Sequence, residues 1–403
     1  MLKLADIQDA RERIASGIVH TPIVPALSLR ADLPSDAYLK LENTQRTGSF
    51  KDRGALNRLL LLSADERRRG VVTASAGNHA QAVAYHGGQL GIRVTVVMPV
   101  HTPLIKVANT EQHGATIVLH GETLAEAMVE AHRREEAQGW VFVHAFDDDQ
   151  VIAGQGTIGL ELLEQLPGLT AVVVPIGGGG LIAGIAMAIK EQRPDVRVYG
   201  VEAAAAASAL ASRRAGYVVA RVTSETIADG IAVKRVGART FPLLERYVDD
   251  IVTVSEEQIA GAVHALLERQ KVLAEGAGAV ALAAVAAGLV PVGVQDTTAM
   301  VLSGGNIDLN LLERIVDRGR VATGRLVRLA ITAPDRPGEL ARMTQLVAEG
   351  GANVLGVTHH RAFADVSVRE VDIIMDLETR GRDQVARIEE LLTSHGFRVR
   401  EGE

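Results

Sequence analysis

In the segment Ser49-Phe50-Lys51-Asp52-Arg53-Gly54-Ala55, a lysine follows an aromatic residue and stands at the start of a predicted helix. The preceding residues 37–42 alternate in the manner of a strand that leads into the segment. A lysine that leaves water at such a junction can have a lowered pKa and attack a carbonyl group. Because most single lysines are solvated, the choice between a structural and a chemical lysine depends on the other motifs of the chain.

Three further motifs follow short apolar segments. Continuous apolar strands that alternate with helices predict parallel sheets covered on both faces. In such folds ligands bind at the carboxyl ends of the strands, so we expect the motifs to gather there, between two α/β lobes. The motifs are Ser75-Ala76-Gly77-Asn78-His79-Ala80-Gln81, Gly177-Gly178-Gly179-Gly180-Leu181 and Ser303-Gly304-Gly305-Asn306.

Taken in this order, the four motifs resemble those of the serine/threonine dehydratases, which are pyridoxal-phosphate enzymes of fold type II, the fold of the tryptophan synthase β subunit. The resemblance covers nearly the whole chain. It implies that Lys51 bonds to pyridoxal 5'-phosphate and later accepts the α-proton of the substrate. It further implies cofactor contacts for Lys51, Phe50, Asn78, Gly177, Gly178, Gly179, Gly180, Leu181 and Ser303, and substrate contacts for Ser75, Ala76, Gly77, Asn78 and His79.

The glycine motif has the properties of an anion-binding loop. Glycines let successive backbone N–H groups turn around an anion, and the N-terminus of the following helix adds positive potential. No lysine follows in the manner of a nucleoside-triphosphate loop, and no acidic partner for a ribose is evident. A single phosphate monoester fits better, and the resembling family uses this loop for the cofactor phosphate.

Ser303 carries the prediction of the reaction type. The family places this serine against the pyridine nitrogen, and a hydroxyl is too weak an acid to keep that nitrogen protonated. The ring is then a weaker electron sink, which disfavours transamination and favours loss of a substituent from the β-carbon. The side-chain amide of Asn78 can bond the phenolic oxygen of the cofactor, and the N–H groups around it can bind the substrate carboxylate at a helix N-terminus. His79 is expected to be structural.

Two positions distinguish this chain from the serine racemases, which it also resembles. Racemases carry a second serine before the Gly-Asn pair as the base on the opposite face, whereas this chain has Ala76, so dehydration is favoured over racemisation. The racemase branch also binds a divalent cation through a glutamate, matched by Glu202, and an aspartate in whose place this chain has Ser208. We therefore expect no metal.

Composition excludes several other classes. The net charge of −7 gives no general attraction to nucleic acid or to an anionic membrane. The absence of cysteine excludes disulfides, thiolate catalysis and Cys-ligated metals. The N-terminus lacks the pattern of a secretory signal, and the longest apolar run, residues 279–292, is too short to span a bilayer. We expect a cytoplasmic enzyme.

A chain of 403 residues is expected to form two or three domains. We predict a catalytic domain at 1–318, with its smaller lobe at about 48–144, and a linker at 319–325. Residues 326–403 show the order βαββαβ of the ferredoxin-like plan. Within them, Asp335-Arg336-Pro337-Gly338-Glu339-Leu340 resembles an ACT domain, a regulatory module that often binds amino acids between paired copies.

The resemblance implies an enzyme of amino-acid metabolism that converts L-threonine to 2-oxobutanoate and ammonia, acts also on L-serine, and can serve isoleucine biosynthesis or a catabolic route. It implies an amino-acid effector at the ACT-like domain and a homodimer or homotetramer. The alternatives are a serine racemase with side elimination, a threonine synthase with a phosphorylated substrate, and a catalytically inert amino-acid-sensing protein.

Overall fold

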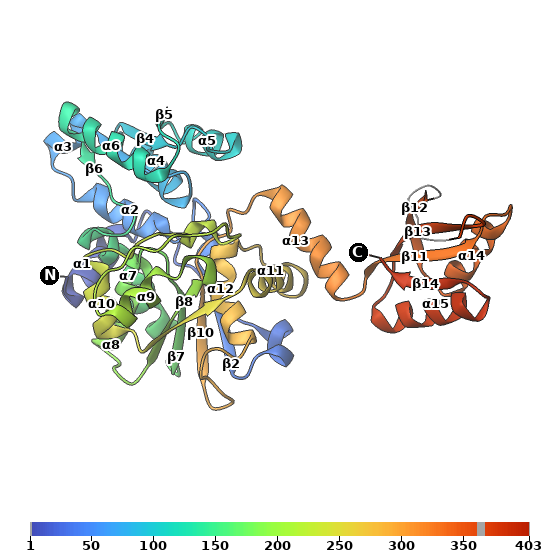
Figure 1. Cartoon of the computed structure of the whole chain (residues 1–403). Coiled ribbons are helices and arrows are strands. Elements are labelled where there is room, and N and C mark those ends of the chain that lie inside the picture. The colour runs from blue at the N-terminus through green and yellow to red at the C-terminus, as the bar shows by residue number, and fades with distance from the viewer. Residues whose placement is uncertain (1, 361–366, 403) are drawn as a thin grey trace. The chain divides into compact units, whose positions relative to one another are not determined.

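The computed structural model describes residues 2–360 and 367–402 and divides into two compact units, Met1–Ile307 and Asp308–Glu403. A mixed sheet forms the base of the first unit (Figure 1), in the order β1-β2-β10-β7-β8-β9. Only β1 is antiparallel to its neighbour, so the carboxyl ends of the other strands share one edge. The strands are β1 (Ile23–Pro25), β2 (Asp36–Leu41), β7 (Ala171–Pro175), β8 (Arg197–Ala203), β9 (Asp250–Val254) and β10 (Thr297–Leu302).

Helices cover this sheet and form the large lobe with it. Two of them, α8 and α12, are apolar around almost their whole circumference, as expected for helices buried on all sides. Helix α7 lies against α8 so closely that a Cβ on Gly184 would stand 2.4 Å from the carbonyl oxygen of Ile152. The helices are α1 (Leu4–Ile14), α7 (Asp149–Gln165), α8 (Gly180–Lys190), α9 (Ser208–Ala215), α10 (Thr240–Tyr247), α11 (Glu256–Ala265) and α12 (Gly276–Ala286), with short 3₁₀ helices at Leu27–Asp32, Glu42–Thr44, Ala204–Ala206 and Asp229–Ile231 and a π-helical turn at Leu266–Gln270.

A second, fully parallel sheet in the order β5-β4-β3-β6 forms the small lobe. Its longest helix is capped by Thr123, whose hydroxyl accepts a hydrogen bond from the Glu126 N–H. The strands are β3 (Val71–Ala74), β4 (Val94–Met98), β5 (Thr116–Leu119) and β6 (Val141–Phe142), and the helices are α2 (Lys51–Leu60), α3 (Ala64–Arg69), α4 (Asn78–Gln89), α5 (Leu104–Glu111) and α6 (Leu124–Gln138).

The predicted two-lobed α/β fold of type II is confirmed. Helix α7 begins at Asp149, where Asp148 accepts hydrogen bonds from the N–H groups of Gln150 and Val151. Its early glycines do not interrupt it because they pack against neighbouring helices. In the part of the chain that the structure describes, no helix has the length and apolarity needed to cross a bilayer.

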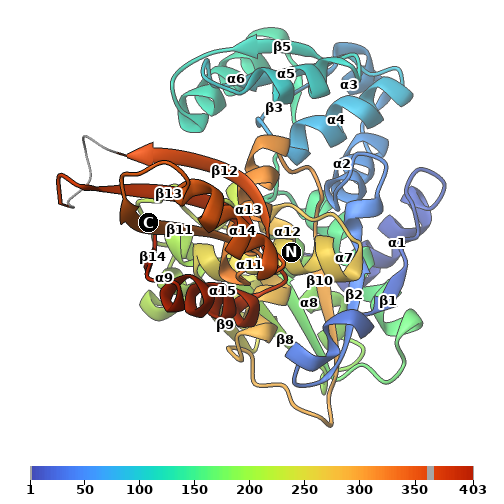
Figure 2. The same ribbon diagram turned by 90° about the vertical axis from the view of Figure 1, so that its right-hand side faces the viewer.

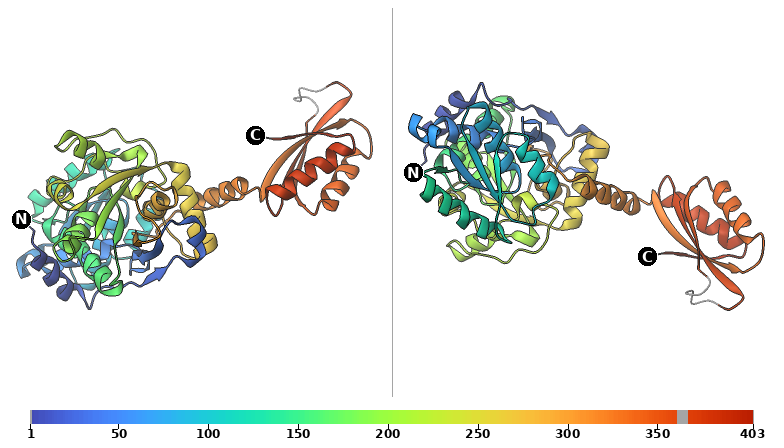
Figure 3. Two further views of the ribbon diagram at one scale, coloured as in Figure 1. Left: turned by 90° about the horizontal axis from the view of Figure 1, so that it is seen from below. Right: turned by 90° about the horizontal axis from the view of Figure 1, so that it is seen from above.

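The second unit has a four-stranded antiparallel sheet in the order β12-β13-β11-β14. Figures 2 and 3 show α14 and α15 on one face of that sheet. This confirms the predicted ferredoxin-like order. The stretch predicted as a linker is partly helical, because α13 continues to Ala322. The elements are α13 (Leu309–Ala322), β11 (Leu326–Pro334), α14 (Glu339–Glu349), β12 (Asn353–His360), β13 (Glu370–Glu378), α15 (Arg382–Ser394) and β14 (Arg398–Glu401).

Candidate active site

The lysine segment and the Ser303 turn lie side by side. They meet because β2 and β10 are neighbouring parallel strands that end together, with Leu41 opposite Leu302. The N–H of Phe50 donates to the carbonyl oxygen of Ser303 over 3.0 Å, and Ser49 forms a bridge with Gly304. The end of β10 therefore fixes the position at which α2 begins.

Lys51 is the first residue of α2, and its side chain is half-buried. Its Nζ donates to the carbonyl oxygen of Ala145 over 2.7 Å and lies 5.0 Å from the centre of the Phe50 ring. Burial lowers the pKa of Lys51 to about 8, although the negative charge of Glu275 opposes the shift. A substantial fraction of this amine is therefore neutral near physiological pH and able to attack a carbonyl.

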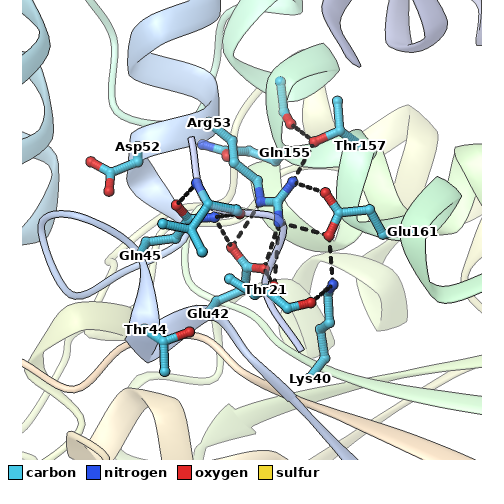
Figure 4. A network of polar contacts seen from close by, with 12 residues as sticks. Thr21, Lys40, Glu42, Thr44, Gln45, Asp52, Arg53, Gln155, Thr157 and Glu161 are labelled. Atoms are coloured by element: carbon cyan, nitrogen blue, oxygen red, sulfur yellow. Dashed lines mark hydrogen bonds and ion pairs between the residues drawn. The ribbon is translucent and has the colours of Figure 1, made fainter. Parts of the chain in front are cut away.

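A buried ionic network holds the first turn of α2 (Figure 4). The Arg53 guanidinium is fully buried and pairs with Glu42 at 2.8 Å and with Glu161 at 2.6 Å. Lys40, also buried, pairs with Glu161 at 2.5 Å and donates to the carbonyl oxygen of Thr21. Burial opposes the charged guanidinium, yet the two carboxylates outweigh it and raise the pKa of Arg53. The four charges compensate one another inside the protein.

Asp52 anchors the same turn from another side. Its carboxylate accepts hydrogen bonds from the N–H of Thr47 at 2.9 Å and from the Thr47 hydroxyl at 2.7 Å, and it lies 3.1 Å from Nε2 of His86. Asp52 and Arg53 are thus buried, and their side chains are used in structural contacts. Lys51 is the residue of this turn whose side chain is available for chemistry.

The glycine loop joins β7 to α8 close to the lysine. Gly179 has φ +93°, and a Cβ on Gly178 would stand 2.3 Å from the ring of Phe146, the residue next to Ala145. None of the described residues 2–360 and 367–402 accepts a hydrogen bond from the N–H groups of Gly177–Gly180. These donors, at the N-terminus of a buried helix, suit an anion such as a phosphate.

The Asn78 loop begins α4 of the small lobe. Asn78 donates from Nδ2 to Oε1 of Glu275 over 2.7 Å and accepts from Asn306 over 2.8 Å. The N–H groups of Ala76, Asn78 and His79 donate to no residue within the described ranges. The loop therefore combines a fixed amide side chain with backbone donors at a helix N-terminus, which suits a carboxylate.

The remaining predicted residues lie around this centre. Ser303 is buried, and its hydroxyl has one weak contact, 3.4 Å to the carbonyl oxygen of Ala277. The imidazole of His79 contacts the carbonyl oxygen of Val143, and burial together with the charge of Lys51 lowers its pKa to about 3, so the ring is neutral. Phe50 and Leu181 pack with the core of the large lobe, Ala76 packs against the core of the small lobe, and the Ser75 hydroxyl accepts from the Gly77 N–H.

Sequence reasoning missed Glu275. It precedes α12, it is buried, and burial with the negative charge of Asp229 raises its pKa to about 7. The available signal was a single carboxylate, Ala274-Glu275-Gly276-Ala277, at the start of an otherwise apolar helix. A charged residue in such a setting is rarely buried without a purpose.

Glu202 is occupied by the protein itself. Its carboxylate accepts hydrogen bonds from the N–H groups of Ala209 and Leu210, both at 2.8 Å, and so caps α9. Among the described residues, no group of three or more His, Asp or Glu side chains is arranged to hold a metal ion.

The donors at this site fit pyridoxal phosphate. The amine of Lys51 suits the aldehyde of that cofactor, and the unpaired N–H groups of the glycine loop suit its phosphate. The buried hydroxyl of Ser303 suits the ring nitrogen, and the oriented amide of Asn78 suits the phenolic oxygen. Lys51 contacts Ala145, and the glycine loop packs against Phe146, the next residue of the chain. The amine and the anion-binding loop therefore lie close together.

Comparison with known proteins agrees with a pyridoxal-phosphate site. A family model described as pyridoxal-phosphate dependent enzyme matches residues 14–304. The chain is 47% identical to the L-threonine ammonia-lyase of Thermotoga maritima over 401 residues, which is 99% of each chain. Among solved structures, threonine deaminase isoform 2 of Solanum lycopersicum matches with TM-score 0.75 and 37% identity over 79% of this chain and 87% of its own. Maize serine racemase matches with TM-score 0.75 and 33% identity over 80% of this chain and 98% of its own. The chain belongs to the pyridoxal-phosphate-dependent enzyme family.

Proposed function

We propose that this protein is a threonine ammonia-lyase, a lyase that converts L-threonine to 2-oxobutanoate and ammonia and also accepts L-serine. The observation that carries this proposal is the match along 99% of both chains to the L-threonine ammonia-lyase of Thermotoga maritima. The site supports it with the amine of Lys51 and the anion-binding loop Gly177–Gly180. It also has the hydroxyl of Ser303 where an acid would keep the pyridine nitrogen protonated.

The proposed reaction assigns the chain's own residues to three tasks. Pyridoxal phosphate, when bound, supplies an electron-withdrawing ring that takes up the electron pair of the broken Cα–H bond. In its neutral form, Lys51 accepts the α-proton. The N–H groups of Ala76, Asn78 and His79 bind the substrate carboxylate, and those of Gly177–Gly180 bind the cofactor phosphate. As the Cβ–O bond breaks, the β-hydroxyl takes up a proton from an acid beside it and leaves as water. The released enamine is hydrolysed to the 2-oxo acid and ammonia.

Ser303 and Ala76 favour elimination over the related reactions. The Ser303 hydroxyl cannot keep a pyridine nitrogen protonated, so an anionic centre at the α-carbon is best relieved by loss of the β-hydroxyl. The methyl group of Ala76 has no proton to deliver to the opposite face of the substrate.

A racemase is the second candidate, because the fold of maize serine racemase matches this chain closely. Chiral analysis of serine incubations separates the two functions: elimination yields pyruvate, whereas racemisation yields D-serine. A catalytically inert sensor is disfavoured because Lys51, Asn78 and Ser303 are all present.

The direct test is an assay of purified protein with pyridoxal phosphate and L-threonine. We expect 2-oxobutanoate and ammonia in equal amounts, with pyruvate from L-serine. A protein that binds the cofactor but forms only D-serine, or forms a product from phosphohomoserine alone, would require a different assignment.

Regulation belongs to the same proposal. We assign residues 1–318 to catalysis and 326–403 to an ACT-like domain that binds an amino-acid effector between two copies of the chain, in a cytoplasmic homodimer or homotetramer. The ferredoxin-like order of β11 to β14 and the Asp335-Arg336-Pro337-Gly338 turn between β11 and α14 support this assignment.

A further inference from the structure

Asn306 has a side-chain orientation that its neighbours determine. Its Nδ2 donates to the backbone carbonyl oxygen of Thr47 over 2.7 Å and to Oδ1 of Asn78 over 2.8 Å. A backbone carbonyl can only accept, so the nitrogen of Asn306 must face Thr47. Both hydrogens of that nitrogen are then used, and the atom of Asn78 that faces Asn306 must be its oxygen.

The orientation of Asn78 follows from that of Asn306. With Oδ1 turned to Asn306, Nδ2 of Asn78 faces Oε1 of Glu275 at 2.7 Å. The reversed amide would place two oxygen atoms at this distance, which is repulsive unless the Glu275 carboxyl is protonated. Nδ2 carries two hydrogens and Glu275 takes one, so the second remains to donate elsewhere.

Glu275 is itself held in place. Its backbone N–H donates to the carbonyl oxygen of Gly304 over 3.1 Å. A Cβ on Gly304 would stand 2.5 Å from Oε1 of Glu275 and 3.2 Å from Nδ2 of Asn78, so the turn after Ser303 leaves just enough room for this contact. Three segments that are distant in the sequence thus converge on one amide group.

We propose that Asn306 and Glu275 are positioning residues that lock the side-chain amide of Asn78 as a hydrogen-bond donor to the phenolic oxygen of pyridoxal phosphate. The inference rests on the role proposed above for Asn78. It adds the reason why this amide donates rather than accepts: Asn306 is a fixed donor on one side of it and Glu275 is an acceptor on the other.

The test measures the bound cofactor rather than turnover. Asn306→Asp cannot donate, so the amide of Asn78 should turn round and present its oxygen to Glu275. Glu275→Ala removes the acceptor, whereas Glu275→Gln keeps a carbonyl oxygen that Asn78 can still face. Asn78→Ala sets the size of the full effect, and Asn109→Asp and Glu136→Gln serve as matched controls away from the site.

For each variant the visible absorbance of the loaded enzyme is titrated with pH, and the cofactor dissociation constant is measured on reloaded apoprotein. We expect Asn306→Asp and Glu275→Ala to shift the absorbance titration in the same direction as Asn78→Ala and to weaken cofactor binding about three- to tenfold, the worth of one such hydrogen bond. Glu275→Gln should bind the cofactor more tightly than Glu275→Ala, and the two controls should match the wild type.

Unchanged spectra in folded Asn306→Asp and Glu275→Ala would overturn the proposal, as would an equal effect of Glu275→Gln and Glu275→Ala. Should Asn306→Asp fail to fold, the comparison of the two Glu275 variants still decides. A normal spectrum in Asn78→Ala would instead remove the cofactor contact of Asn78, while threonine turnover by the wild type tests the proposed function separately.

Discussion

Nζ of Lys106 on α5 lies 2.5 Å from Oδ2 of Asp229, in the 3₁₀ helix Asp229–Ile231 of the large lobe. The ion pair joins the two lobes beside the site, since a Cβ on the adjacent Gly230 would stand 3.4 Å from Oε1 of Glu275. Both side chains are partly exposed, so the pair contributes little to global stability. The pair therefore links α5 of the small lobe to the large lobe at the edge of the site.

We therefore expect Lys106→Ala to raise KM for L-threonine about two- to fivefold, with a change of less than about 1 kcal/mol in the free energy of unfolding. Asp229→Ala should behave alike, and the double variant should add no further increase. Lys190→Ala removes an ion pair within the large lobe and serves as the control. A KM that is unchanged in Lys106→Ala would show that this contact between the lobes does not assist substrate binding.

Lys51→Ala should fold, bind no cofactor covalently and lose threonine turnover by at least about a thousandfold, because it removes both nucleophile and base. Its thermal stability should equal or exceed that of the apoprotein, since burial disfavours the ammonium group that is removed. The measurements are visible absorbance, turnover and thermal unfolding, with Lys3→Ala as the surface control. Turnover retained by Lys51→Ala would remove the central assignment.

The pH dependence of cofactor capture should report the pKa of Lys51 directly. The neutral amine attacks the aldehyde, and with a pKa of about 8 its neutral fraction rises roughly fivefold from pH 7 to 8 and less than about twofold from 8 to 9. An ordinary lysine would gain roughly tenfold per pH unit over the whole range. Stopped-flow capture of pyridoxal phosphate by apoprotein distinguishes the two. If Glu275→Gln shows the same change of slope near pH 8, the Glu275 carboxyl is not the group that causes it.

Arg53→Met should destabilise the protein by about 3–5 kcal/mol, because it leaves Glu42 and Glu161 buried without their main partner. Arg11→Met breaks an exposed pair with Glu164 and should cost no more than about 1 kcal/mol. Chemical denaturation of both variants gives the comparison. Equal losses would mean that the buried network does not support α2.

The four motifs and the two-lobed fold could be predicted because their signals are local. Apolar strands, glycine turns and a helix-starting lysine are each contained in a few consecutive residues. Lys51 and Ser303 were therefore found in the sequence, and the structure places their segments together through β2 and β10.

The contacts between distant segments could not be predicted in this way. Glu275 reads as one acid before an alanine-rich helix, and nothing local connects it with Asn78 or Asn306. Likewise Arg53 and Glu161 look like surface charges on their own helices, and only the packing of α2 against α7 buries them as a pair. Burial and partner choice depend on tertiary structure, which periodicity does not encode.

The ferredoxin-like unit has a hydrophobic core of its own, and all the proposed site residues lie in Met1–Ile307. Deletion from Leu326 onward should therefore keep threonine turnover and abolish the response to an amino-acid effector. The assay compares activity with and without isoleucine or valine. A response that survives the deletion would place the effector site in the catalytic unit.

A pair of glycines in the same unit allows a finer test. Gly338, in the turn before α14, and Gly396, before β14, have φ of +96° and +89°, and neither would bring a Cβ within 4 Å of another group. Gly338→Ala and Gly396→Ala therefore carry a similar strain, about 1–2 kcal/mol each. Because only Gly338 belongs to the ACT-like turn, Gly338→Ala should raise the half-maximal effector concentration severalfold and Gly396→Ala should not. Equal responses in the two variants would separate this turn from the effector site.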